Sequence, residues 1–292
     1  MSAKSVPNLG KQHSQGYFVW QRLKKNKGAM VGLIVICLLI LVMIFADVLF
    51  DYKTEVIKNH VKERLQGPSA AHWLGTDEMG RDILARIVHG SRRSVLIGVA
   101  STTLATLIGA TLGAIAGFYG GKLGELIMGF MDILLAIPAT LFAIIIVAVL
   151  GASIPNLIIA CCAATIPKMA RILRSSVMAC RNSEYVEACR ARGLKESSIL
   201  VRHIIPNAIA PLFVQYTIYV GSTIILLSGM SFLGLGIQAP TPEWGAMLSN
   251  ARTYIRDYSY MCMFPGLAIV LAILSLNLLG DGLRDALDPR LK

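Results

Sequence analysis

Long uncharged apolar runs constrain this chain more than any other feature of its sequence. The first, Gly28–Ala46, contains no Asp, Glu, Lys or Arg, and five further apolar runs follow it. About 20 apolar residues in a helix are enough to cross a bilayer. With 55% hydrophobic and 15% charged residues, the sequence predicts an all-α membrane protein with six transmembrane helices. The later runs are Ser94–Phe118, Leu126–Leu150, Leu157–Ala170, Asn207–Gly236 and Tyr258–Leu279.

The positive charge is distributed as a topology signal. Residues 1–28 hold six Lys or Arg and no acid, and residues 168–206 hold eight Lys or Arg against three acids. Both patches flank apolar runs, and cytoplasmic loops of membrane proteins carry an excess of Lys and Arg. We therefore expect a multi-pass protein of the cell (inner or plasma) membrane, surrounded by lipids, with both termini cytoplasmic. The net charge of +11 is explained in this way, and no nucleic-acid partner is predicted.

One polar stretch, residues 183–206, interrupts the apolar second half of the chain. Ser183 is suited to an N-cap, with Glu184 in the first helical turn, where a helix favours negative charge. Gly193 is suited to end this short helix, and a second one would cover Glu196–His203. Two short helices joined at a glycine between two spans predict a rigid projection into the cytoplasm. Such a projection is suited to contact with a partner protein.

The residues of this stretch resemble the EAA loop of ABC-importer permeases. The resemblance rests on Glu187-Ala188-Cys189, on Gly193 and on His203-Ile204-Ile205-Pro206. Three positions depart from the general pattern by small or apolar-compatible changes: Cys189, His203 and Ile205. In that family the loop docks in a cleft of the ATPase subunit. The resemblance therefore implies an ATPase-docking surface formed by Tyr185, Glu187, Ala188, Ala191, Arg192 and Gly193.

Three further stretches are similar to the second permease subunit of dipeptide, oligopeptide and nickel importers, the dipeptide-permease C-type. They are LGTDEMGRDILARIVHG from Leu74, SFLGLGIQAPTPEWGAML from Ser231, and the C-terminal GDGLRDALDPRLK. The resemblance implies the type I ABC importer permease fold with a cytoplasmic coupling loop, and a translocation path for di- or oligopeptides. Import of nickel or of glutathione by the same type of machine stays open.

The same resemblance implies a set of partners. They are a second homologous permease subunit, two ABC ATPase subunits that bind ATP and Mg, and an extracytoplasmic solute-binding protein. No cofactor is expected in this chain. The predicted parts are a cytoplasmic N-terminal segment (1–28), a first transmembrane helix (29–50), an external loop (51–93) with an interfacial helix at Arg81–Val88, a five-helix permease core (94–281) that includes the coupling loop (171–206), and a cytoplasmic tail (282–292).

The sequence contains no catalytic constellation. It has no G-x4-G-K-[ST] loop for nucleotide binding, and its five histidines are scattered. His72 and Asp82 lie in a glycine-rich external stretch without a second cluster of ligands, so they do not predict a metal site. The six cysteines lack metal or disulfide spacing. We therefore expect a non-catalytic subunit whose partners hydrolyse ATP.

An ATP-independent secondary carrier is the alternative of a different class. Such a carrier needs charged groups near the bilayer midplane, and Asp132 is the only acidic residue inside the six predicted spans. We expect Asp132 to pair with a loop arginine, a proton relay being the alternative interpretation. The predicted spans therefore favour the ATP-driven transporter.

Glycine, proline and tryptophan positions add predictions about the spans. The spacing of Gly109, Gly113 and Gly117 places small residues along one helical ridge, which permits close helix packing in lipid. Pro138 should kink the third span, and Pro167 should mark the end of a short fourth span. Trp244 is expected to anchor at the membrane interface, stacking on a passing substrate being the alternative.

Overall fold

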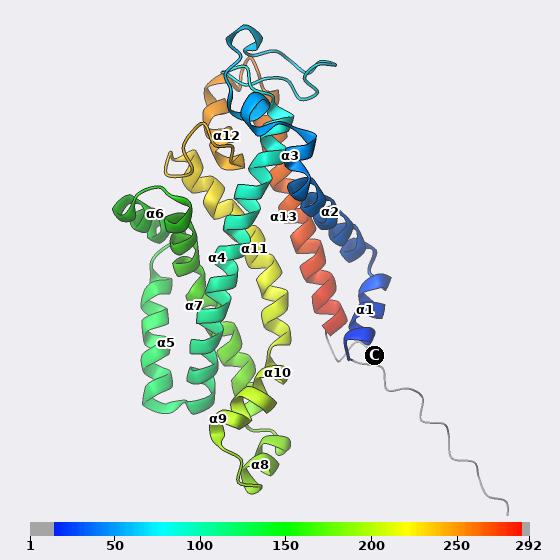
Figure 1. Ribbon diagram of the computed structural model, residues 1–292. Helices are drawn as coiled ribbons and strands as arrows, with labels where there is room; N and C mark the ends of the chain where they lie inside the picture. Colours follow the sequence, from blue (N-terminus) through cyan, green and yellow to red (C-terminus); the bar gives the residue numbers. More distant parts are fainter. Residues whose placement is uncertain (1–14, 288–292) are drawn as a thin grey trace, which may run out of the picture.

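The computed structural model describes residues 15–287, and helices dominate it (Figure 1). Within that range the structure contains no β-strand, and β-type pairing is limited to one isolated antiparallel bridge between Thr76 and Asp82. Five helices are long and apolar enough to cross a membrane, or six if one bent pair of helices counts as a single span. The all-α membrane fold predicted from the apolar runs is confirmed.

The long helices form a bundle, with α8 and α9 at one end and α12 at the other (Figure 1). Short 3₁₀ or π-helical turns are labelled η. The helices are α1 (Gln15–Lys25), α2 (Lys27–Ile44), α3 (Ala46–Leu49), η1 (Tyr52–Ile57), η2 (Val61–Glu63), α4 (Ile83–Tyr119), α5 (Gly121–Ala136), α6 (Ala139–Leu150), α7 (Ile154–Arg181), α8 (Glu184–Ala191), α9 (Glu196–Ile199), η3 (Leu200–Ile204), α10 (Ile205–Ala208), α11 (Ala210–Phe232), α12 (Trp244–Ala251), η4 (Arg252–Tyr254) and α13 (Tyr260–Leu287).

Helix α4 packs along α7 through the predicted ridge of small residues. A Cβ atom added to Gly109 would lie 2.6 Å from the carbonyl oxygen of Ile166, and one added to Gly113 would overlap the backbone of Ala170. Gly117 meets the backbone of α7 in the same way. Only glycine permits this approach, so the interpretation of the ridge as a packing surface is confirmed.

The predicted third span is broken rather than kinked. Helices α5 and α6 meet at an angle of 87°, and Figure 1 shows α6 turned away from the direction of α5. Ile137 adopts an extended conformation, as expected for the residue before a proline. Pro138 then occupies the N-cap of α6, since it has no N–H to donate to a continuing helix. The local break is therefore a direct consequence of Pro138.

Helix α7 is twice as long as the predicted fourth span. It covers 28 residues, and Pro167 lies inside it. The prediction that Pro167 ends the span is therefore wrong. The side of α7 around Pro167 is buried against α4 and α11, and this packing stabilises a helix that the local sequence would interrupt. As a consequence, Lys168, expected at the end of the span, lies in the interior of a helix that continues to Arg181.

The end of the bundle near α12 also differs from the sequence-based expectation. The interfacial helix predicted at Arg81–Val88 is not a separate element, because α4 continues without a break from Ile83 for 37 residues. The Asp82 carboxylate caps α4 by accepting a hydrogen bond of 2.9 Å from the Ala85 amide.

Trp244 has neither of its predicted roles. Its side chain is fully buried, among apolar residues of α11 and α13. The indole N–H donates a hydrogen bond of 3.0 Å to the carbonyl oxygen of Ile87 in α4. Trp244 is therefore a core residue that joins α12 to three long helices, and it contacts neither lipid headgroups nor a substrate.

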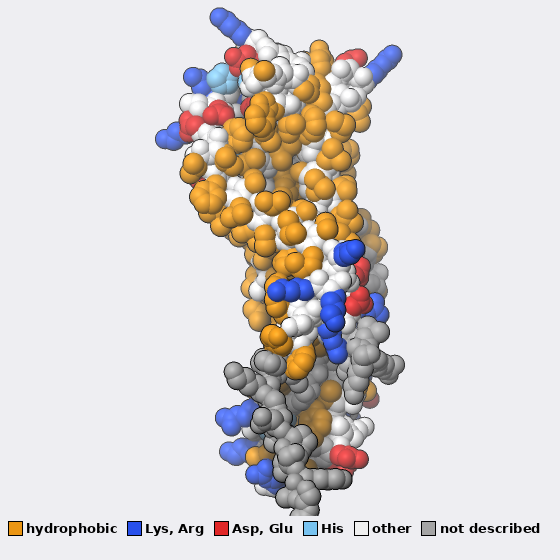
Figure 2. Space-filling view, turned by 90° about the vertical axis from the view of Figure 1, so that its right-hand side faces the viewer, with side chains coloured by type: hydrophobic (Ala, Val, Ile, Leu, Met, Phe, Trp, Pro, Cys, Tyr) orange, Lys and Arg blue, Asp and Glu red, His pale blue; other side chains and the backbone are white. Residues whose placement is uncertain are grey.

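The surface carries the hydrophobic belt expected of a membrane protein. Figure 2 shows hydrophobic side chains covering the middle of one face, between a cap with charges of both signs and a region with Lys and Arg side chains. The first apolar helix, α2, packs on α13 and is only 11% buried over its apolar window. Its remaining apolar surface is available to lipid.

Candidate functional site

Helix α8 forms an exposed projection at one end of the bundle (Figure 1). The predicted docking residues Glu187, Ala188, Ala191, Arg192 and Gly193 are all exposed. Tyr185 is 38% exposed, and partial burial raises the pKa of its phenol. The structure therefore brings the six predicted residues together on the free surface of α8 and its C-terminal turn.

The opposite face of α8 is anchored in the bundle. Val186 is fully buried in an apolar cluster with Phe118 at the end of α4 and with Leu173 and Val177 of α7. Ile199, in the second short helix, is fully buried in the same cluster. A close-packed cluster of this kind transmits displacement instead of absorbing it. A force applied to α8 would therefore act on α4 and α7.

The joint after α8 has the geometry that the sequence predicts. Gly193 has φ +74°, a conformation open mainly to glycine. Its N–H donates to the carbonyl of Arg190 at 2.8 Å, and the N–H of Leu194 donates to that of Cys189 at 3.2 Å. These two bonds form a Schellman motif. An ion pair of 3.1 Å between Arg190 and Glu196 closes the joint, so α8 and α9 are held at a defined angle.

Two local details of this loop differ from the prediction. Ser183 occupies the N-cap position of α8, but its hydroxyl donates to the carbonyl of Cys180 and does not cap the helix. The predicted second helix, Glu196–His203, is divided into α9 and the π-helical turn η3. Pro206 follows immediately in α10 and has no N–H for the regular helical ladder, which fits the wider turn before it.

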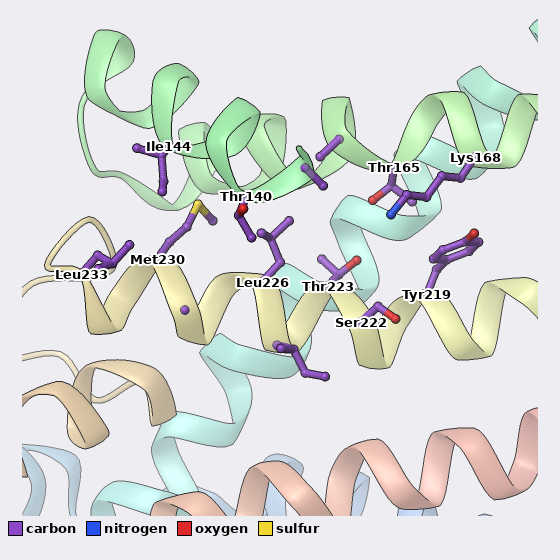
Figure 3. Close-up of a pocket in the computed structure, with 14 residues that line it drawn as sticks. Thr140, Ile144, Thr165, Lys168, Tyr219, Ser222, Thr223, Leu226, Met230 and Leu233 are labelled. Carbon is purple, nitrogen blue, oxygen red and sulfur yellow. The ribbon is translucent and has the colours of Figure 1, made fainter. Parts of the chain in front are cut away.

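A groove between α6, α7 and α11 is the second candidate site (Figure 3). Its volume is about 350 Å³. Apolar side chains such as Ile144, Leu226 and Met230 line one stretch, as Figure 3 shows. The polar residues that line it are Thr140, Thr165, Lys168, Tyr219, Ser222 and Thr223. A mainly apolar cleft with a few polar groups is the usual form of a small-molecule path or site.

Sequence reasoning missed this groove, although part of its signal is visible in the sequence. Tyr219, Ser222 and Thr223 recur at i, i+3 and i+4, which places them on one face of α11. A hydroxyl-bearing stripe on an otherwise apolar span is the pattern that points to it. Lys168 escaped notice because it was expected at the end of the fourth span, close to Pro167.

Asp132, the acid in the predicted third span, pairs with an arginine, as expected. Asp132 in α5 accepts a hydrogen bond of 2.6 Å from the guanidinium of Arg171. Arg171 lies on α7 instead of in a loop, and both side chains are more than half exposed. The ion pair confirms the pairing interpretation and gives no support to a proton relay.

At the other end of the bundle, buried charges fasten the segment 51–82 to α4. Asp77, 6% exposed, forms ion pairs of 2.7 Å with Arg81 and 3.4 Å with Arg86. Arg86 also donates to the carbonyl oxygens of Val56, at 2.7 Å, and Pro240, at 3.2 Å. A buried ion pair of this kind requires its additional hydrogen bonds to offset desolvation. The network is therefore structural.

The described residues contain no group of three or more His, Cys, Asp or Glu side chains that would hold a metal ion. The imidazole of His72 lies 2.9 Å from the carboxylate of Asp82, whose other oxygen caps α4. All six cysteines are free thiols. In residues 15–287 the geometry thus favours protein contact at α8 and passage along the groove over a metal centre.

Two family models match the chain. Residues 109–292 match the family described as the binding-protein-dependent transport system inner membrane component. Residues 14–68 match the N-terminal TM domain of oligopeptide transport permease C. The first match covers the groove and the α8 projection, and the second covers α1, α2 and most of the segment 51–82.

Several relatives are similar over almost their whole length. The dipeptide transport system permease protein DppC of Alkalihalophilus pseudofirmus is 47% identical over 94% of this chain and 89% of its own. The di/tripeptide transport system permease protein DppC of Pseudomonas aeruginosa is 43% identical over 94% and 91%. The glutathione transport system permease protein GsiD of Pectobacterium atrosepticum is 41% identical over 94% and 90%.

Among solved structures, the MetNI methionine ABC transporter in inward-facing conformations has the same fold. Its TM-score is 0.58 at 17% identity, over 70% of this chain and 98% of the other. The match to the inner membrane component family covers more than half of the chain. The dipeptide permease from Alkalihalophilus pseudofirmus is also 47% identical over nearly the whole chain. The chain therefore belongs to the family of inner membrane components of binding-protein-dependent transport systems, the permeases of ABC importers.

Proposed function

We propose that this protein is the C-type permease subunit of an ABC importer for di- and oligopeptides. The observation that carries the proposal is the 47% identity with a dipeptide permease over 94% of the chain. A di/tripeptide permease at 43% identity supports the same solute class. The chain itself forms part of the translocation path and hydrolyses nothing, since ATP and Mg bind to the partner ATPases.

The complete importer contains a second homologous permease, two ABC ATPase subunits and an extracytoplasmic solute-binding protein. The groove between α6, α7 and α11 is open along part of its length, which leaves room for a second permease to cover it. The exposed surface of α8 supports an ATPase partner, with Tyr185, Glu187, Ala188, Ala191, Arg192 and Gly193 at the contact.

The orientation follows from charge and shape. In Figure 1 the α8 projection, α1 and the end of α13 lie toward one end of the molecule, and α12 with the segment 51–82 lies at the other. Basic residues are concentrated in 168–206 and in 1–28. The positive-inside rule then assigns the α8 end and both termini to the cytoplasm. The opposite end receives the binding protein.

Transport is driven through α8. ATP binding closes the ATPase pair and moves α8, and the cluster around Val186 carries this motion into α4 and α7. A ligand shifts a conformational equilibrium only by its differential affinity for the two states. ATP must therefore favour the outward-open packing of these helices over the inward-open packing.

The test is uptake by the reconstituted importer. The chain is expressed with a second permease, ATPase and binding protein of an importer from the same organism, and the complex is placed in proteoliposomes. We expect ATP-dependent uptake of a labelled dipeptide that requires the binding protein. Uptake without ATP would instead identify a secondary carrier.

Glutathione is the second candidate solute, because permeases for it share 41% to 42% identity over 94% of the chain. Competition separates the candidates: unlabelled dipeptide, glutathione and Ni²⁺ are added to the same uptake assay. We expect dipeptide to inhibit most strongly. Stronger inhibition by glutathione would assign the importer to that tripeptide instead.

A further inference from the structure

The groove between α6, α7 and α11 holds one charged side chain. Of the fourteen residues that line it, Lys168 is the only Lys, Arg, His, Asp or Glu. Its ammonium nitrogen lies 5.5 Å from the centroid of the Tyr219 ring on α11. Figure 3 shows this nitrogen beside Thr165 and toward the groove. The lysine therefore presents its charge inside the path and not to the surrounding lipid.

This charge has no acidic counterpart in the part of the chain that the structure describes. None of the ion pairs within residues 15–287 involves Lys168. Asp132, the acid of the third span, is already bonded to Arg171 at 2.6 Å. The Tyr219 ring offers a cation–π contact, which compensates only in part for lost hydration.

Three hydroxyl groups that line the groove already form hydrogen bonds within the protein. Thr165 donates to the carbonyl of Cys161 at 2.9 Å, and Ser222 donates to that of Ile218 at 3.1 Å. The hydroxyl of Thr223 is bonded to that of Thr102 on α4 at 3.1 Å. Lys168 thus combines a full charge with three donors that no hydrogen-bond acceptor within residues 15–287 occupies.

An ionised residue inside a transmembrane bundle is costly and usually functional. Lys168 is 14 residues from the start of α7, which is about 21 Å along the axis of a helix long and apolar enough to cross a bilayer core of about 30 Å. A carboxylate that passes through the groove would supply the missing acceptor in a charge-assisted hydrogen bond. A bare divalent cation would be repelled by the same group.

We propose that Lys168 is a specificity-determining residue of the translocation path, which receives the carboxylate of the passing peptide. This inference rests on the proposed function and identifies a feature of the solute, since di- and tripeptides carry a carboxylate and Ni²⁺ does not. Thr165 and Tyr219 flank the ammonium and hold it toward the groove. The contact is transient, as a path must also release its solute.

The experiment compares Lys168→Gln and Lys168→Arg in the complete importer, in proteoliposomes with its binding protein and labelled dialanine. Two quantities are measured, dialanine uptake and the ATP hydrolysis that the loaded binding protein stimulates. We expect Lys168→Gln to reduce dialanine taken up per ATP by about tenfold, the effect of losing one charge-assisted contact. Lys168→Arg should retain most of the uptake because it keeps the charge.

Two control variants separate this role from a general loss of charge or of packing. Lys122→Gln removes an exposed lysine outside the groove, and Thr111→Ala shortens an exposed polar side chain of α4 that is also outside it. Both should behave as the unmodified chain does. Recovery of the assembled Lys168→Gln complex in detergent shows that the variant folds.

The outcomes are distinguishable. Unchanged dialanine uptake per ATP in Lys168→Gln would overturn the inference and leave the proposed function intact. Equal losses in Lys168→Gln and Lys168→Arg, together with lost ATPase stimulation, would also overturn it, because they indicate a packing or coupling role. Failure of the unmodified importer to take up any peptide would overturn the proposed function itself.

Discussion

The guanidinium of Arg190, in the last turn of α8, lies 6.0 Å from the ring centroid of Phe118 at the end of α4. The same arginine forms an ion pair with Glu196 of α9. One side chain thus connects the exposed projection to the second short helix and to the longest helix of the bundle. This contact and the apolar cluster beneath it explain how a surface loop is fixed rigidly to membrane-spanning helices.

The first prediction concerns the exposed face of α8. Ala188→Trp should abolish ATP-driven peptide uptake, because an indole in place of a methyl group prevents close docking of the ATPase. Ala188 is exposed, so the protein should still reach the membrane in normal amounts. Labelled-peptide uptake and immunoblotting of membranes measure both effects.

Ser197→Trp is the control for this substitution, since Ser197 is exposed on α9 and outside the six docking residues. It should leave uptake unchanged. Normal uptake by Ala188→Trp would contradict the role of α8 as the docking helix.

The second prediction concerns the joint at Gly193. Its φ of +74° costs a residue with a Cβ atom about 1–2 kcal/mol. No neighbouring atom lies within 4 Å of that Cβ position, so the effect is one of backbone conformation alone. Gly193→Asp and Gly193→Val should both reduce uptake, and Gly193→Asn should reduce it least because asparagine tolerates this conformation.

Uptake is compared with the amount of each variant that copurifies with the ATPase. If Gly193→Asn and Gly193→Val were equally impaired, the conformational explanation would be wrong. The side chain itself would then be the obstacle.

The third prediction concerns the ridge between α4 and α7. Gly113→Ala should destabilise the protein by about 1–3 kcal/mol or more, because the added methyl group overlaps the backbone of Ala170. Thermal unfolding in detergent measures the effect as a lowered Tm.

Gly129→Ala in α5 is the matched control. No atom lies within 4 Å of its Cβ position, so the substitution should be neutral or should stabilise the helix by up to about 1 kcal/mol. Equal Tm values for the two variants would contradict close packing at Gly113.

The fourth prediction concerns Glu243, a fully buried acid. Its carboxylate accepts hydrogen bonds of 2.8 Å from the amides of Gly245 and Ala246, and of 3.0 Å from the Ser94 hydroxyl. Glu243→Ala leaves these donors unsatisfied and should cost about 1–3 kcal/mol. Because Glu243 caps the N-terminus of α12, the amides of α12 should exchange hydrogen faster in Glu243→Ala than in the unmodified chain.

Glu125→Ala removes an exposed acid and should not alter exchange in α12. Protection of α12 in Glu243→Ala equal to that of the unmodified chain would show that packing of Trp244 alone holds this helix.

The sequence by itself determined the features that depend on local physics. Apolar runs specify membrane helices whatever they pack against, because the bilayer is their solvent. Gly193 ends α8 as predicted, since a positive φ is a property of one residue and its neighbours. The ridge of Gly109, Gly113 and Gly117 was equally readable, because helical spacing alone places the three residues on one face.

Tertiary structure decided what depends on distant partners. The two prolines illustrate the difference: Pro138 breaks a helix and Pro167 does not, because α7 is held straight by packing on α4 and α11. Helix packing also places Lys168, expected at the end of the fourth span, in the groove, and it buries Trp244 where an exposed anchor was expected. A chain lists its charges and apolar residues in order, but only the packing of helices remote in sequence determines which of them share a cavity.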